Sequence, residues 1–144
     1  MRQNDPWKSY RQVATQTATP GQLILMLYDG AIRFLERALG GFDLDDPAES
    51  NSTINNNILR TQEILNELNA SLNTEAGGEL ARHLRQVYLY LDWRLTESNV
   101  KKDAEGIREA ITKLTVLREA WAAMLAGASA PTAAEQPATE LAVA

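Results

Sequence analysis

Apolar residues recur at steps of three and four in four stretches of this chain, and each stretch predicts one amphipathic helix. The clearest stretch covers residues 48–72, and its repeat consists of Ile54, Ile58, Thr61, Leu65, Leu68 and Leu72. Similar spacing predicts helices over residues 19–39, about 79–99 and about 103–125. No stretch shows the strict alternation of apolar and polar residues that a half-buried strand would have. Four helices of this length joined by short turns predict an all-α fold, an antiparallel four-helix bundle.

The start of the first predicted helix carries a strong local signal. Thr19 can cap the helix, Pro20 suits its first position, and Gln22 stands three residues after the cap, so the three residues predict a capping box. Gly40 and Gly41 predict the end of the same helix. In the third predicted helix the inward positions are expected to be Leu80, Leu84, Val87, Leu91 and Leu95, with Tyr88, Tyr90 and Trp93 on other faces.

The two ends of the chain differ from the middle. Trp7, Tyr10 and Val13 form a short apolar stripe at steps of three, but a helix of one or two turns is marginal in water without a surface to lie on. Residues 127–144 are mostly Ala, Pro, Thr and Glu and are expected to be disordered. We therefore expect a mobile N-terminal cap segment over residues 1–18, a bundle domain over 19–126 and a disordered tail over 127–144.

Composition narrows the possible functions. The chain has 144 residues, a formal net charge of −5 and no cysteine, so neither a disulfide nor a thiolate site is possible. An acidic protein with a pI of about 4.9 is a poor candidate for nucleic-acid binding. The N-terminus lacks the apolar region of a signal peptide, and no run of residues approaches the length of a membrane span. These features predict a cytoplasmic protein without membrane insertion.

Candidate catalytic chemistry is sparse. His83 is the single histidine, and one histidine cannot supply the paired Glu-x-x-His motifs of a metal-binding bundle. Neither of the glycine-rich phosphate-binding motifs is present. We therefore expect no catalytic residue, metal or cofactor. One alternative stays open, since some four-helix bundles carry phosphate on an exposed helical histidine. Residues 83–87 lack the glycine of the His-x-Leu-Lys-Gly motif of those phosphotransfer domains, although His83 is the position such a protein would use.

Several sequence blocks, in order, resemble those of the flagellin export chaperone family, FliS. The block over residues 19–31, T-P-G-Q-L-I-L-M-L-Y-D-G-A, is similar to the family's hallmark, here carried by Thr19, Pro20, Leu23, Leu27, Tyr28 and Gly30. Further similarity lies in residues 5–10, 55–68, 88–95 and 117–121, so the resemblance covers most of the foldable chain. Trp7, Thr61 and Trp93 depart from the residues that are usual in the family.

The resemblance implies a chaperone rather than an enzyme. Such a protein binds the disordered C-terminal segment of flagellin, prevents its premature polymerisation and delivers it to the flagellar type III export apparatus. The implied partners are flagellin, an export gate protein and possibly a co-chaperone, and the free protein is expected to be a monomer or weak dimer. The resemblance also implies that the N-terminal cap segment covers a client groove until flagellin displaces it.

Apolar residues outside the main helical repeats of the second and third helices are candidates for that groove: Leu59, Ile64, Tyr90 and Trp93. Leu68, which belongs to the repeat of the second helix, completes the predicted client-binding residues. Two other readings remain open: these residues could belong to the periphery of the core, or they could pair two copies of a purely structural bundle.

Overall fold

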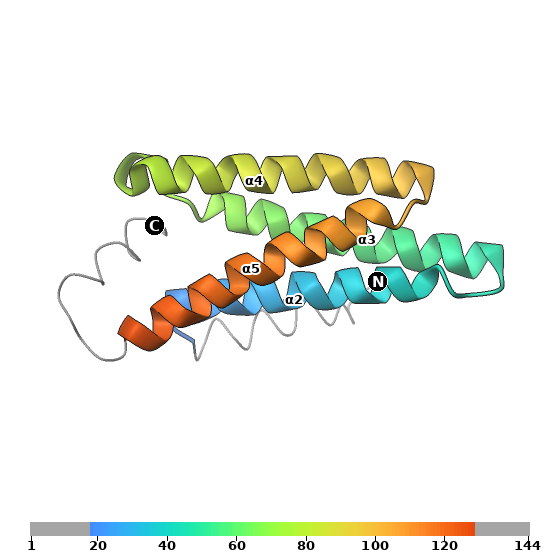
Figure 1. Ribbon diagram of the computed structural model, residues 1–144, viewed down its shortest axis with the longest axis horizontal. Helices are drawn as coiled ribbons and strands as arrows, with labels where there is room; N and C mark the ends of the chain where they lie inside the picture. The colour runs from blue at the N-terminus through green and yellow to red at the C-terminus, as the bar shows by residue number, and fades with distance from the viewer. Residues whose placement is uncertain (1–17, 129–144) are drawn as a thin grey trace, which may run out of the picture.

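The computed structural model describes residues 18–128, and within that range the chain forms four helices. The helices are α2 (Pro20–Gly41), α3 (Pro47–Ala70), α4 (Thr74–Lys101) and α5 (Glu105–Ala128). Successive helices run in opposite directions along the molecule (Figure 1). The prediction of an all-α bundle is confirmed. None of the helices in this range is long and apolar enough to cross a membrane.

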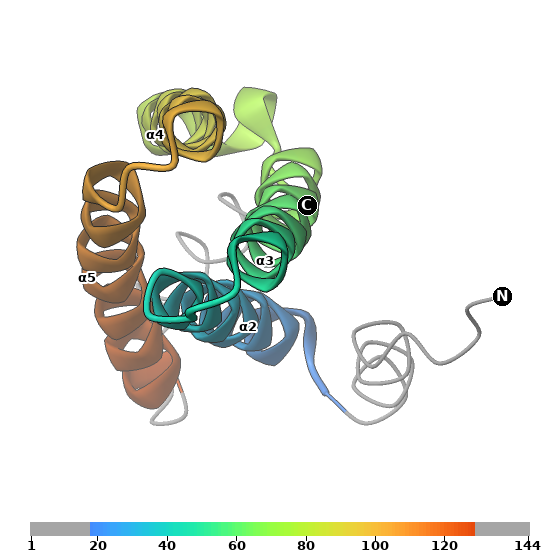
Figure 2. The same ribbon diagram turned by 90° about the vertical axis from the view of Figure 1, so that its right-hand side faces the viewer.

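The four helices surround one apolar core. Seen end-on in Figure 2, they follow one another around the core in chain order, with α5 returning to α2. Helices α2 and α4 therefore lie diagonally opposite each other. The largest fully buried apolar side chains come from all four helices: Leu35, Ile54, Ile58, Ile64, Leu65, Leu68, Leu91, Leu95, Ile107 and Leu114.

Local sequence signals place the helix ends. The predicted capping box is present, because the Gln22 amide nitrogen of the backbone donates to Thr19 Oγ1 at 3.2 Å and the Thr19 N–H donates to Gln22 Oε1 at 3.1 Å. At the starts of α3 and α4 the N-cap side chain alone accepts a hydrogen bond: Asp46 accepts from the Glu49 N–H and Asn73 from the Ala76 N–H. Gly78 interrupts α4 with a φ of 59°, so one helical turn precedes it and the long straight part of the helix begins at residue 79, as predicted.

The buried side of α4 differs in part from the predicted one. Tyr88 is buried, whereas Leu80 is exposed and Val87 is only half-buried. The reason is a polar contact inside the core: the hydroxyls of Tyr88 and Tyr28 lie 2.5 Å apart and form a hydrogen bond between the diagonal helices α4 and α2. Burial raises the pKa of both hydroxyls, so both stay protonated at neutral pH.

Polar contacts also join neighbouring helices. Trp121 Nε1 in α5 donates to the carbonyl oxygen of Gly21 in α2 at 2.8 Å, and Arg118 Nε pairs with Asp29 Oδ1 at 2.7 Å. The indole of Trp121 is itself buried. These contacts fix the last turns of α5 against the beginning of α2.

Candidate functional site

The outer face of α4 carries large apolar side chains that have no place in the core. Leu89, Trp93 and Val100 are 55%, 57% and 79% exposed. They are four and seven residues apart, so they lie on one side of the helix. The buried residues Leu84, Tyr88, Leu91 and Leu95 occupy the opposite side. We call Leu89, Trp93 and Val100 the outer stripe of α4.

Tyr90 lies between the outer stripe and α5, and polar contacts hold it there. Its hydroxyl donates to Glu109 Oε2 at 2.6 Å, while Arg94 Nε donates to Glu109 Oε1 at 3.0 Å. The hydrogen bond from Tyr90 is the main reason that the pKa of the Glu109 carboxyl is lowered, so this group is ionised at neutral pH. The rings of Tyr90 and Trp93 are tilted neighbours, with centroids 6.0 Å apart. The two predicted aromatic residues are therefore adjacent.

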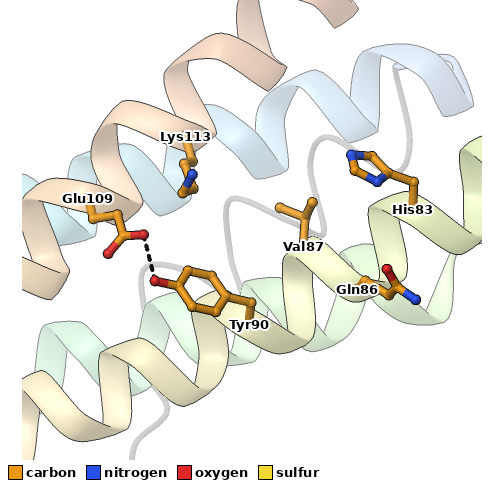
Figure 3. A pocket seen from close by; sticks show the side chains of 6 residues that line it. All are labelled: His83, Gln86, Val87, Tyr90, Glu109 and Lys113. Carbon is orange, nitrogen blue, oxygen red and sulfur yellow. Dashed lines mark hydrogen bonds between the residues drawn. The ribbon is translucent and has the colours of Figure 1, made fainter.

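A pocket opens between α4 and α5 beside Tyr90. Its volume is about 330 Å³, and six side chains line it: His83, Gln86, Val87, Tyr90, Glu109 and Lys113. Figure 3 shows Glu109 and Lys113 reaching the pocket from α5, while Tyr90, Val87 and His83 approach from successive turns of α4. The axes of α4 and α5 diverge away from their connecting turn, which leaves room for this pocket (Figures 1 and 2).

Only some of the predicted groove residues lie at the surface. Leu59 is exposed on α3, and Tyr90 and Trp93 are exposed on α4. The prediction was wrong for Ile64 and Leu68, which are 0% and 1% exposed and belong to the core. The physical reason is that α3 packs against both α2 and α4, so its buried side is wide enough to include Ile64, outside the main repeat, as well as Leu68, which belongs to that repeat.

The remaining predicted residues belong to the N-terminal cap segment and to the family hallmark at the start of α2. Trp7, Tyr10 and Val13 lie outside the described residues. Among the hallmark residues, Thr19 and Pro20 begin α2, Leu23 and Leu27 are half-buried, and Tyr28 and Gly30 are buried. The hallmark thus builds the bundle rather than the exposed surface.

The described residues offer little for catalysis. His83 lies on α4 at one side of the pocket, with Lys113 facing it from α5. Within residues 18–128, no group of three or more His, Asp or Glu side chains could hold a metal ion. What the surface provides is an apolar stripe, two aromatic rings and a charged pocket, which suit the binding of a polypeptide.

Sequence reasoning missed Gln86, Val87, Glu109 and Lys113 as parts of a surface site. The sequence predicts Val87 in the core, and the two α5 residues belong to no sequence motif. One signal was available, because His83, Val87 and Tyr90 follow the four- and three-residue steps of one helix face. The face could be read from the sequence, but not which residues of α5 lie opposite it.

Comparison with known proteins assigns the chain to a family. Residues 3–128 match the model of the family described as "Flagellar protein FliS". The "Flagellar secretion chaperone FliS" of Bacillus subtilis (strain 168) is 35% identical over 117 residues, covering 81% of this chain and 84% of that protein. Its namesake from Salmonella typhimurium is 37% identical over 118 residues, covering 79% of this chain and 85% of that protein.

A third relative extends the agreement. The "Flagellar secretion chaperone FliSB" of Pseudomonas aeruginosa is 30% identical over 118 residues, which cover 79% of this chain and 90% of that protein. The resemblance inferred from the sequence blocks is confirmed by the family match and by these relatives. This chain belongs to the FliS family of flagellar secretion chaperones.

Proposed function

We propose that this protein is a cytoplasmic chaperone that binds the disordered C-terminal segment of flagellin, prevents its premature polymerisation and delivers it to the flagellar type III export apparatus. The observation that carries the proposal is the family match over residues 3–128. The relatives are named as secretion chaperones rather than enzymes, and the proposed role is likewise binding without catalysis.

The outer surface of α4 supports this role physically. A disordered client must give up conformational entropy when it is ordered, so it needs a large apolar surface to compensate. The outer stripe of α4, together with Tyr90, offers apolar side chains at the helical spacing that an amphipathic client helix can match. Leu59 on α3 adds a further exposed apolar position. We propose Leu59, Tyr90 and Trp93 as client contacts.

The N-terminal segment has a proposed role in regulating access. Trp7, Tyr10 and Val13 would serve as an internal ligand that occupies part of the client surface until flagellin displaces it. Burial of one such aromatic contributes on the order of 2–3 kcal/mol, but the conformational entropy lost on ordering the segment offsets most of this gain, so the net free energy of displacement is small.

Titration of the purified protein with the C-terminal segment of its cognate flagellin, about 50 residues, tests the proposal. We expect saturable one-to-one binding by calorimetry, with a negative heat-capacity change that reflects burial of roughly 1,000–3,000 Å². Fluorescence of the exposed Trp93 should change in the same titration. Absence of binding by folded protein to intact peptide would contradict the proposal.

The phosphotransfer alternative makes a separate prediction. It requires that a phosphodonor label His83 and that His83→Gln abolish the label. We expect no label on either protein, because the chaperone role uses no phosphoryl chemistry. Labelling that depends on His83 would favour the alternative.

A further inference from the structure

We infer that the pocket between α4 and α5 binds an acidic side chain of the client, adjacent to an apolar one, and that Lys113 is its ion-pair partner. This inference rests on the proposed function, because the flagellin C-terminal segment is the client. It adds a chemical requirement that the apolar surface does not impose, namely a carboxylate at a fixed place in the bound segment.

The charges around the pocket leave one cation in excess. Glu109 is held by Tyr90 and Arg94, and Arg94 also pairs with Glu97, which in turn pairs with Lys101. In this chain of contacts, Arg94 and Lys101 balance the two carboxylates. Lys113 lies close enough to lower the pKa of Glu109, yet no ion pair joins it to any of the described residues. Among the residues that line the pocket, Lys113 is thus a cation without an ion-pair partner in the described part of the chain.

The position of Lys113 favours a ligand over a purely solvated role. It is exposed and lines the pocket, and in the view of Figure 3 it is drawn between Glu109 and Val87. His83 lines the same pocket one turn of α4 before Val87. The Lys113 ammonium and the N–H of the His83 ring are both hydrogen-bond donors, which suits an acceptor-only carboxylate.

Apolar contacts define the second part of the ligand. Val87 provides an apolar surface inside the pocket, and the Tyr90 ring connects it to Trp93 and the outer stripe of α4. A client helix lying along this side of α4 would place an apolar residue against Val87 and Tyr90. An acidic residue three or four positions away would then reach Lys113, because those spacings share one helix face.

Charge reversal at Lys113 tests the inference. We expect Lys113→Glu to bind the flagellin peptide about three- to tenfold more weakly, with a smaller loss for Lys113→Gln, and we expect the difference to shrink in high salt. Arg108→Glu is the matched control, because it makes the same charge change on an exposed position of α5 that does not line the pocket. Circular dichroism should show both variants folded.

Rescue identifies the client residue. Each acidic residue of the peptide is replaced by lysine in turn, and one of these peptides should bind Lys113→Glu more tightly than the unchanged peptide does. Equal affinity of Lys113→Glu and Arg108→Glu, or the absence of any rescuing peptide, would overturn the inference while leaving the chaperone proposal intact. A parent protein that fails to bind the peptide at all would overturn both.

Discussion

Helix α4 has two apolar faces, one buried in the core and the other exposed to solvent. The inner face, with Leu84, Tyr88, Leu91 and Leu95, is buried among the other three helices. The outer stripe, with Leu89, Trp93 and Val100, has similar spacing and similar hydrophobicity but faces solvent. Helical periodicity thus identifies an apolar face, while the neighbouring helices determine whether that face is buried in the fold or remains available to a partner.

The largest effect should come from the inner face. Leu91 is fully buried, so Leu91→Ala removes apolar contacts and leaves a cavity. We expect the free energy of unfolding to fall by about 2–5 kcal/mol in urea denaturation followed by circular dichroism. The matched control is Leu89→Ala, two residues away on the exposed side, which should change stability by less than about 0.5 kcal/mol. A similar loss in the free energy of unfolding for both variants would contradict the assignment of Leu91 to a buried face and Leu89 to an exposed one.

Alkaline pH should lower the free energy of unfolding through the two tyrosines that are hydrogen-bonded in the core, Tyr28 and Tyr88. Burial raises the pKa of Tyr28 and Tyr88 in the folded state, whereas in the unfolded chain both ionise near pH 10. Above that pH the unfolded state therefore binds fewer protons than the folded state does. The stability that the two tyrosines contribute is fully present below pH 10 and is lost as the pH rises above it. The expected slope is at most about 1.4 kcal/mol per pH unit for each tyrosine.

The double variant Tyr28→Phe/Tyr88→Phe isolates this effect, because it removes both hydroxyls and leaves neither unpaired. Its unfolding free energy, measured by denaturation at a series of pH values, should depend less on pH above 10 than that of the parent. Unchanged dependence would mean that other groups, such as Tyr90, account for the alkaline loss.

A substitution in the outer stripe should weaken binding of the flagellin peptide and leave the free energy of unfolding unchanged. Trp93→Ala removes the largest exposed side chain of the stripe, and we expect the affinity for the flagellin peptide to fall by about 1–2 kcal/mol, roughly 5- to 30-fold. Leu44→Ala, in the loop between α2 and α3, is a control for loss of an exposed apolar side chain elsewhere. Calorimetry would contradict the proposed site if the two variants bound equally well.

The smallest effect is expected from removal of residues 1–17. If this segment competes with the client, its removal should tighten peptide binding by about two- to fivefold, because the client-binding surface is then uncovered in every molecule. The unfolding transition of the truncated chain should match that of the parent. A loss of helical content well beyond the removed residues would assign the segment to the core instead.

Sequence patterns predicted the features that depend on nearby residues. The capping box at Thr19 and Gln22 forms because its two partners are three residues apart, and the long part of α4 begins at residue 79, where the apolar spacing predicts it. The exposure of Leu59 and Trp93 likewise follows from their place outside the main repeats.

Features that depend on distant partners were not predictable in this way. Tyr88 is buried because Tyr28, 60 residues earlier in the chain, satisfies its hydroxyl. Ile64 is in the core although it lies outside the main repeat, because α3 has two neighbours, which the repeat itself does not reveal. The place of Lys113 beside the pocket depends on how α5 is rotated against α4, a property of the assembled bundle.

The contact of Trp121 with Gly21 has a consequence for the connectivity of the chain. It brings residues that are 100 positions apart into one hydrogen bond, so the beginning of α2 and the last part of α5 lie at the same pole of the bundle. Segment ends at one pole can be joined by a short linker, and new ends can be opened elsewhere. A circular permutant of residues 18–128, opened in the turn between α3 and α4, is therefore expected to keep all four helices in place, with the order of the helices in the chain changed but the architecture preserved.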